Sequence, residues 1–128
     1  MKILGIDFGK KKVGVAIASG FISEPLKTVR YRNMETLYQE IIKIVKSNDV
    51  AKIVVGLPGG VLDKEIRLFG GQLSKLSNAQ VFYHDETLST KEANSLAISS
   101  GMKRSKRKRN EDAHAAAVVL QSFIDTHV

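Results

Sequence analysis

The order of its apolar segments constrains the fold of this chain more than any other feature. Two short runs rich in β-branched residues, 2–7 and 13–18, are separated by a connection that contains a glycine, which predicts a β-hairpin. Three further apolar runs, at 26–31, 52–56 and 80–84, are expected to form strands. Apolar residues at helical spacing follow the third strand and each of the later ones, which predicts helices there.

Four helices are predicted, and each has a residue that can cap its N-terminus. The caps are Asn33, Asp63, Ser89, which opens a capping-box pattern, and Asn110. Gly101 is suited to end the third helix. The predicted element order is therefore βββαβαβαα.

This order predicts an α/β fold built on a mixed five-stranded sheet. The three leading strands are expected to form an antiparallel meander, because they follow one another closely. The later strands are separated by helices, so their connections are expected to be right-handed parallel crossovers, with helices on both faces of the sheet. A length of 128 residues is typical of one domain, so residues 1–128 are expected to fold as a single unit.

The composition excludes several classes of site. The chain contains no cysteine, which rules out disulfides, thiolate zinc sites and a cysteine nucleophile. No apolar run approaches the ~20 residues of a membrane span. The N-terminal apolar stretch is short and interrupted by an aspartate, which is unlike a signal peptide. We therefore expect a cytoplasmic protein that does not interact with membranes.

Basic charge is concentrated in one short segment. The formal net charge is +7, and six of the seven residues at 103–109 are basic. Without this segment, basic and acidic side chains nearly balance. Concentrated basic charge attracts nucleic acids, because contact with phosphates releases condensed counterions, although a solvated surface loop explains such a run equally well. The candidate phosphate-binding residues are Lys10, Lys11, Lys12, Lys103, Arg104, Lys106, Arg107, Lys108 and Arg109.

Carboxylates stand at three positions where the predicted fold accommodates charge poorly or binds ligands. Asp7 ends an otherwise apolar strand, and a charge there needs a cation or hydrogen-bond donors. Asp85 and Glu86 follow the fifth strand at its C-terminal end, the edge where open α/β sheets bind ligands. Asp112 falls in the first turn of the last helix, on the side that faces the sheet.

Each of these acids has an ordinary structural explanation when taken alone, such as a turn, a loop or a favourable helix dipole. All of them, however, are predicted near one rim of the sheet, where their repulsion requires a cation. Oxygen ligands without cysteine suit Mg²⁺ or Mn²⁺, and two such ions about 4 Å apart can promote phosphodiester hydrolysis. Gly5, Gly9 and Gly14 surround Asp7 and could let another backbone approach closely.

Four blocks of the sequence together resemble one protein family. They are GIDFGKKKVGVAIA, VVGLP, HDETLST and NEDAHAAAVVLQSFID, and they follow the family's order over residues 2–125. The combination is similar to the YqgF family, whose members are described as Holliday-junction resolvases and as pre-16S rRNA nucleases. The resemblance implies a ribonuclease H-like fold related to that of the RuvC resolvases.

The resemblance also implies a set of site residues. The first-strand aspartate of the family corresponds to Asp7, the glutamate of its D-E-(R/T)-L-(S/T)-T block to Glu86 and its last-helix aspartate to Asp112. These residues are expected to bind divalent metal and to be catalytic, with Asp85 as a neighbouring acid at the metal. Thr87 stands where the family commonly has an arginine, which removes one possible phosphate ligand.

The leading hypothesis is a metal-dependent nuclease that acts on structured RNA or branched DNA, as a monomer or weak homodimer. Two alternatives stay open. The first block also resembles the phosphate loop of actin-like ATPases, although those proteins need a second domain that a chain of this length lacks. A nucleic-acid-binding protein without catalysis would use the basic segment alone. The sequence does not distinguish a DNA junction from precursor ribosomal RNA.

Overall fold

A computed structural model of the chain describes residues 1–86 and 111–127. The helix expected after Ser89 and the basic segment 103–109 lie outside the described residues. The elements are β1 (Lys2–Asp7), β2 (Lys12–Ala18), β3 (Ser23–Arg30), α1 (Met34–Ser47), β4 (Val50–Leu57), α2 (Asp63–Ser77), β5 (Gln80–Asp85) and α5 (Glu111–Thr126).

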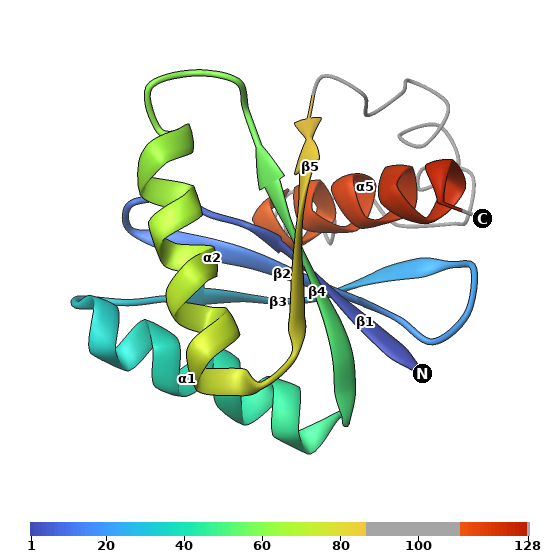
Figure 1. Cartoon of the computed structure of the whole chain (residues 1–128), viewed down its shortest axis with the longest axis horizontal. Helices are drawn as coiled ribbons and strands as arrows, with labels where there is room; N and C mark the ends of the chain where they lie inside the picture. Colours follow the sequence, from blue (N-terminus) through green and yellow to red (C-terminus); the bar gives the residue numbers. More distant parts are fainter. Residues whose placement is uncertain (87–110, 128) are drawn as a thin grey trace.

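The strands form a mixed sheet in the order β3-β2-β1-β4-β5. The pairs β1–β2 and β2–β3 are antiparallel, whereas β1–β4 and β4–β5 are parallel. Helices α1 and α2 cover one face of the sheet and α5 covers the other (Figure 1). The predicted meander, parallel crossovers and two-sided covering are confirmed.

Two local predictions were wrong. Strand β3 begins at Ser23 rather than Leu26, because Pro25 is tolerated on an edge strand, where it pairs with Ala16 at a register shift. Asp63 is the first residue of α2 rather than its cap. Its carboxylate instead accepts hydrogen bonds from the backbone N–H groups of Gly59 (3.0 Å) and Gly60 (3.4 Å), which closes the turn before the helix.

The two faces of the sheet have different cores. On the α1 and α2 side, bulky side chains such as Leu4, Ile53 and Phe69 are fully buried. On the α5 side, the sheet contributes small residues such as Ala16 and Ala18, and α5 packs directly against them. Alternation along each strand separates the two sets.

Helix α5 approaches the sheet so closely that glycine is required beneath it. A Cβ atom at Gly5 would lie 2.7 Å from Leu120 Cβ, and one at Gly14 would overlap the carbonyl oxygen of Asp112. The close backbone approach that Gly5 and Gly14 allow is thus used by α5 itself. In the described part of the chain, no helix is long and apolar enough to span a membrane.

Candidate active site

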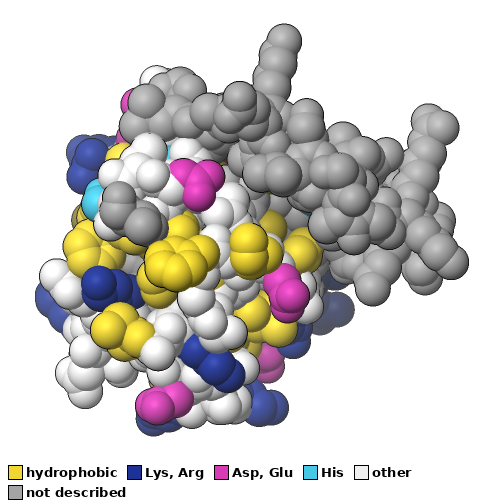
Figure 2. Space-filling view, turned by 90° about the vertical axis from the view of Figure 1, so that its right-hand side faces the viewer, with side chains coloured by type: hydrophobic (Ala, Val, Ile, Leu, Met, Phe, Trp, Pro, Cys, Tyr) yellow, Lys and Arg dark blue, Asp and Glu magenta, His cyan; other side chains and the backbone are white. Residues whose placement is uncertain are grey.

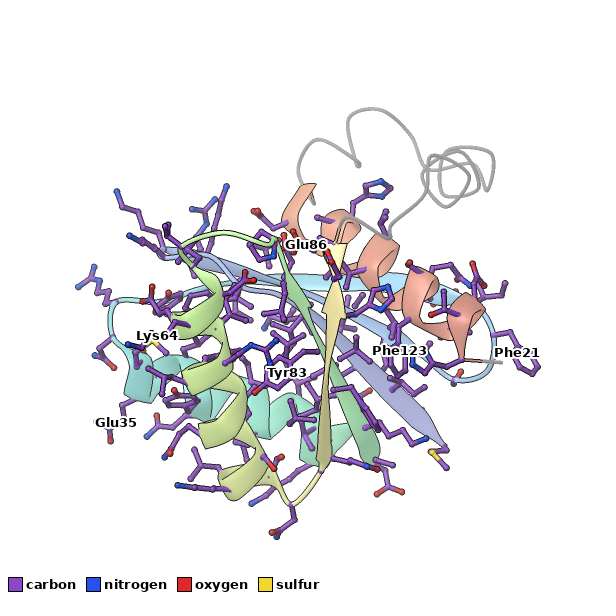
Figure 3. All side chains as sticks on the ribbon, turned by 45° about the horizontal axis from the view of Figure 1, so that its top comes forward. Phe21, Glu35, Lys64, Tyr83, Glu86 and Phe123 are labelled. Atoms are coloured by element: carbon purple, nitrogen blue, oxygen red, sulfur yellow. The ribbon has the colours of Figure 1, made fainter. Side chains whose placement is uncertain are left out.

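The C-terminal ends of β1, β4 and β5 lie at the same edge of the sheet, because these three strands are parallel. Asp7 ends β1, and Glu86 follows β5 directly. Figure 3 shows Glu86 at the tip of β5, close to the beginning of α5. The fold therefore brings two of the predicted acids to one rim.

Both acids lie on the side of the sheet that faces α5. Asp7 lies two residues beyond Gly5, whose position faces Leu120 of α5. Glu86 lies two residues beyond His84, and His84 Nε2 is 2.9 Å from the Ser122 hydroxyl oxygen of α5. Both acids therefore lie on the face of the sheet that α5 covers.

Asp7 is in electrostatic contact with both other acids. The pKa of Asp7 is raised from 3.8 to about 7, and burial is the largest cause. A side-chain hydrogen bond with Glu86 and the negative charges of Glu86 and Asp112 contribute the rest of this increase. Without a cation, Asp7 therefore holds a proton that an ordinary aspartate loses at much lower pH.

A second glycine on this face makes room for Glu86. A Cβ atom at Gly56 would lie 2.7 Å from Glu86 Oε1 and 3.2 Å from Val119 Cγ1. The Glu86 carboxylate therefore reaches over β4 toward β1, where Asp7 lies. Sequence reasoning missed Gly56, although a glycine inside a strand is a recognised signal of close approach.

Asp112, in the first turn of α5, approaches Asp7 from above strand β2. Its backbone rests on Gly14, which the sheet register pairs with Asp7. Its carboxylate forms an ion pair with Lys12, with 3.2 Å between Nζ and Oδ2. Lys12 lies two residues before Gly14 on β2, so both positions face α5. The predicted acid of the last helix therefore reaches the group, already paired with a cation.

Asp85 does not join these three acids. The register pairs Asp85 with Leu57, and Leu57 belongs to the core on the α1 and α2 side. Directly paired residues share a face of the sheet, so Asp85 lies on the opposite face from Glu86. The expectation that Asp85 is a neighbouring metal ligand is therefore not supported by the register.

The predicted basic residues are only partly described. Lys10 and Lys11 are exposed in the turn between β1 and β2, which lies at the left in Figure 1. Arg30, which sequence reasoning missed, pairs with Lys12 in the register and is exposed on the same face. The opposite side of the molecule, in Figure 2, shows basic and acidic side chains interspersed among hydrophobic ones. Among the described residues, the cation that pairs with one of the three acids is Lys12, at the start of β2.

The carboxylate oxygens at this rim are of the type that binds a hard divalent cation, but they do not surround one point. Oxygen atoms of carboxylates are the ligands that Mg²⁺ and Mn²⁺ prefer. Asp7 and Glu86 are in direct contact and face each other as such a pair. Within residues 1–86 and 111–127, however, no three acidic or histidine side chains are arranged to hold one ion. The third acid, Asp112, is paired with Lys12 in this arrangement.

Curated relatives match almost the whole chain. A protein of Rickettsia canadensis (strain McKiel), named "Putative pre-16S rRNA nuclease", is 32% identical over 98% of this chain and 86% of its own length. A protein of the same name from Rickettsia africae (strain ESF-5) is 33% identical over 97% of this chain and 86% of its own length.

Solved structures agree with the fold. RuvC of Thermus thermophilus in complex with a Holliday junction has a TM-score of 0.69, with 14% identity over 99% of this chain and 96% of that one. The Fowlpox virus resolvase bound to Holliday junction DNA has a TM-score of 0.66, with 13% identity over 98% of each chain. At such low identity these structures establish the ribonuclease H-like fold alone.

The family assignment rests on a match to the chain as a whole. The model of the RuvX family, described as "Holliday junction resolvase", matches residues 1–126. This match and the curated relatives confirm the resemblance to the YqgF family that the four sequence blocks indicated. The chain therefore belongs to the RuvX family, and it is a nuclease by that membership.

Proposed function

We propose that this nuclease requires a divalent metal and that Asp7, Glu86 and Asp112 are its metal-binding and catalytic carboxylates. The observation that carries the proposal is the convergence of acids from β1, β5 and α5 on one rim, where Asp7 contacts Glu86 and is repelled by Asp112. A fold rarely gathers three acids unless a cation compensates their charge.

The packing around the acids supports a built site rather than an accidental cluster. Gly14 and Gly56 are both on the face of the sheet that carries the acids, and each lacks the Cβ that would displace a neighbouring acid. A pKa raised to about 7 also shows that ionisation of Asp7 is costly in the metal-free protein. A dication would reverse this cost, since it favours the ionised form.

The residues have separate roles in this proposal. Asp7 is the central ligand, Glu86 reaches it from over β4, and Asp112 completes the set from α5. When bound, Mg²⁺ or Mn²⁺ supplies Lewis-acid stabilisation of the charge that develops on the phosphoryl oxygens. Lys10, Lys11, Lys12 and the segment 103–109 bind phosphates of the substrate backbone and fix its position.

Precursor 16S ribosomal RNA is the substrate that we propose first. The curated relatives carry that name and match this chain at 32–33% identity over nearly its whole length. A Holliday junction is the second candidate, and the description of the RuvX family favours it. Both are structured nucleic acids with closely spaced phosphates, which the acids and lysines of this rim suit equally.

A cleavage panel with Mn²⁺ tests the proposal. The substrates are a ribosomal precursor fragment, a four-way DNA junction and an unstructured single-stranded RNA. We expect cleavage of the first or second by the wild-type protein, and a loss of activity on the order of 10²- to 10³-fold or more in Asp7→Asn.

The matched control is Glu40→Gln, which removes an acid that pairs with Lys27 (3.9 Å) on the opposite side of the sheet. We expect full activity in this variant. Undiminished cleavage by Asp7→Asn, or cleavage by the wild type that persists in EDTA, would refute the assignment of the site.

A further inference from the structure

Among the described residues, Lys12 is the only cation that forms an ion pair with one of the three acids. Its Nζ lies 3.2 Å from Asp112 Oδ2, at the corner where the N-terminus of α5 rests on β2. The position is set by the sheet, because Lys12 and Gly14 face the same side of β2 and Gly14 is paired with Asp7. Lys12 is therefore held at the rim by the strand on which it lies.

The acids do not form a three-ligand site as they stand, and this ion pair engages one of them. Asp7 and Glu86 are hydrogen-bonded to each other, while Asp112 is engaged by Lys12. No three acids of the described part surround a common point. A metal that binds all three acids therefore competes with Lys12 for the Asp112 carboxylate.

We propose that Lys12 is a built-in counter-cation of Asp112 that competes with the divalent metal, so that metal binding exchanges the lysine for the ion. The inference rests on the proposed function, because it assumes that Asp112 is a metal ligand. In this role Lys12 acts through Asp112 and sets the metal affinity of the site.

The exposure of the two side chains makes such an exchange feasible. The Lys12 side chain is 46% exposed and that of Asp112 is 29% exposed, so the ammonium group can leave for solvent. An ion pair with this exposure shifts an equilibrium by roughly fivefold at most, which a dication bound by three carboxylates can overcome. The lysine therefore weakens metal binding without preventing it.

The alternative is that Lys12–Asp112 is an ordinary surface ion pair without influence on the metal. The chain contains a matched example, Lys27–Glu40, with 3.9 Å between the charged atoms and side chains that are 49% and 46% exposed. Removal of either lysine changes the net charge by the same amount. Of these two lysines, only Lys12 contacts one of the three acids.

The test is calorimetric titration of Mn²⁺ into the full chain without nucleic acid, so that the readout is affinity rather than activity. The variants are Lys12→Met, Lys12→Arg and the control Lys27→Met. We expect Lys12→Met to bind Mn²⁺ roughly three- to fivefold more tightly than the wild type, because the competitor is gone. Lys12→Arg keeps the competing charge and should stay within about twofold of the wild type, as should Lys27→Met.

Unchanged or weaker binding in Lys12→Met would overturn the inference, and so would equal tightening in Lys27→Met, which would show an effect of net charge alone. Thermal melts in EDTA establish that each variant folds, and Lys12→Gln replaces Lys12→Met if the latter does not.

Mn²⁺ titration of Asp7→Asn distinguishes a failure of the Lys12 inference from a failure of the proposed metal site. If the wild type binds Mn²⁺ in a way that depends on Asp7 and Lys12→Met does not tighten it, only the inference fails. If Asp7→Asn binds Mn²⁺ as the wild type does, the proposed function fails as well.

Discussion

The two faces of the sheet differ in the size of their side chains, although the same strands form both. The face under α1 and α2 is filled by large apolar side chains such as Phe69, which stacks near Phe8 and Tyr38 with ring centroids 4.8 Å and 5.7 Å away. The face under α5 replaces bulk with glycine at positions 14 and 56, and it ends in acids. The face under α1 and α2 contributes most of the large buried side chains. The face under α5 has small residues instead, which lets α5 lie close enough to the sheet to place Asp112 near Asp7.

This division predicts that damage to the two faces has different consequences. Substitutions on the α1 and α2 side should cost stability and leave the chemistry of the folded molecules intact. Substitutions on the α5 side should alter metal binding and cleavage more than stability.

The largest effect on stability is expected from Phe69→Ala. This side chain is fully buried, so its truncation leaves a cavity and should lower the free energy of unfolding by about 3–5 kcal/mol. Urea denaturation measures the loss. Mn²⁺ affinity per folded molecule should remain that of the wild type, and a comparable loss of affinity would show that the two faces are not separable.

The next effect is a dependence of the free energy of unfolding on pH, caused by the raised pKa of Asp7. Its pKa is about 7 in the folded protein against an ordinary value of 3.8. Below pH 3.8 both states hold the proton, so the shift costs nothing. Between pH 3.8 and about 7 only the unfolded state releases it, so the free energy of unfolding falls, by a total on the order of 4 kcal/mol at most.

Asp7→Asn, which cannot ionise, supplies the comparison. In EDTA, this variant should lack that part of the fall and should be more stable than the wild type at pH 8. Urea denaturation of both proteins from pH 4 to pH 8 measures the difference. Parallel stability curves would show that Asp7 ionises in the fold as freely as in the unfolded chain.

A smaller loss of stability is expected from Gly14→Ala. The added Cβ would overlap the carbonyl oxygen of Asp112, so the N-terminus of α5 must move away from β2. We expect a cost of about 1–3 kcal/mol, together with weakened Mn²⁺ binding because Asp112 is displaced. Gly60→Ala is the matched control, because a Cβ there meets no other atom within 4 Å. Equal Mn²⁺ affinity in Gly14→Ala and the wild type would contradict the role of the close approach.

The smallest effect is expected from Asp85→Asn. Asp85 is adjacent to Glu86 in sequence but lies on the other face of the sheet, so its loss should change cleavage by less than about tenfold. Glu86→Gln should reduce cleavage by on the order of 10²-fold or more. Cleavage assays on the same substrate compare the two, and a larger defect in Asp85→Asn would reverse the assignment of these neighbours.

Much of this arrangement follows from the sequence. Apolar patterning predicted the element order, and the order predicted the sheet topology that was found. The rim shared by Asp7, Glu86 and Asp112 follows because parallel strands end at one edge and the first turn of the last helix lies beside them. Alternation along β5 could also have placed Asp85 on the face opposite to His84, since the two residues are consecutive on that strand.

Other features depend on distances that a pattern does not contain. The pairing of Lys12 with Asp112 arises because α5 rests on Gly14, and neither the helix position nor the lysine rotamer is encoded locally. The capping prediction at Asp63 failed for a similar reason. The aspartate bonds backward to Gly59 and Gly60, which a glycine-containing turn permits as readily as a cap.

The central claim is that three acids from β1, β5 and α5 form one metal site. It is tested most directly by anomalous diffraction from crystals of the protein soaked in Mn²⁺. We predict an anomalous peak within bonding distance of carboxylate oxygens of Asp7, Glu86 and Asp112, with the Lys12 ammonium group moved away from Asp112. A peak bound elsewhere, or no peak at this rim at saturating Mn²⁺, would contradict the account.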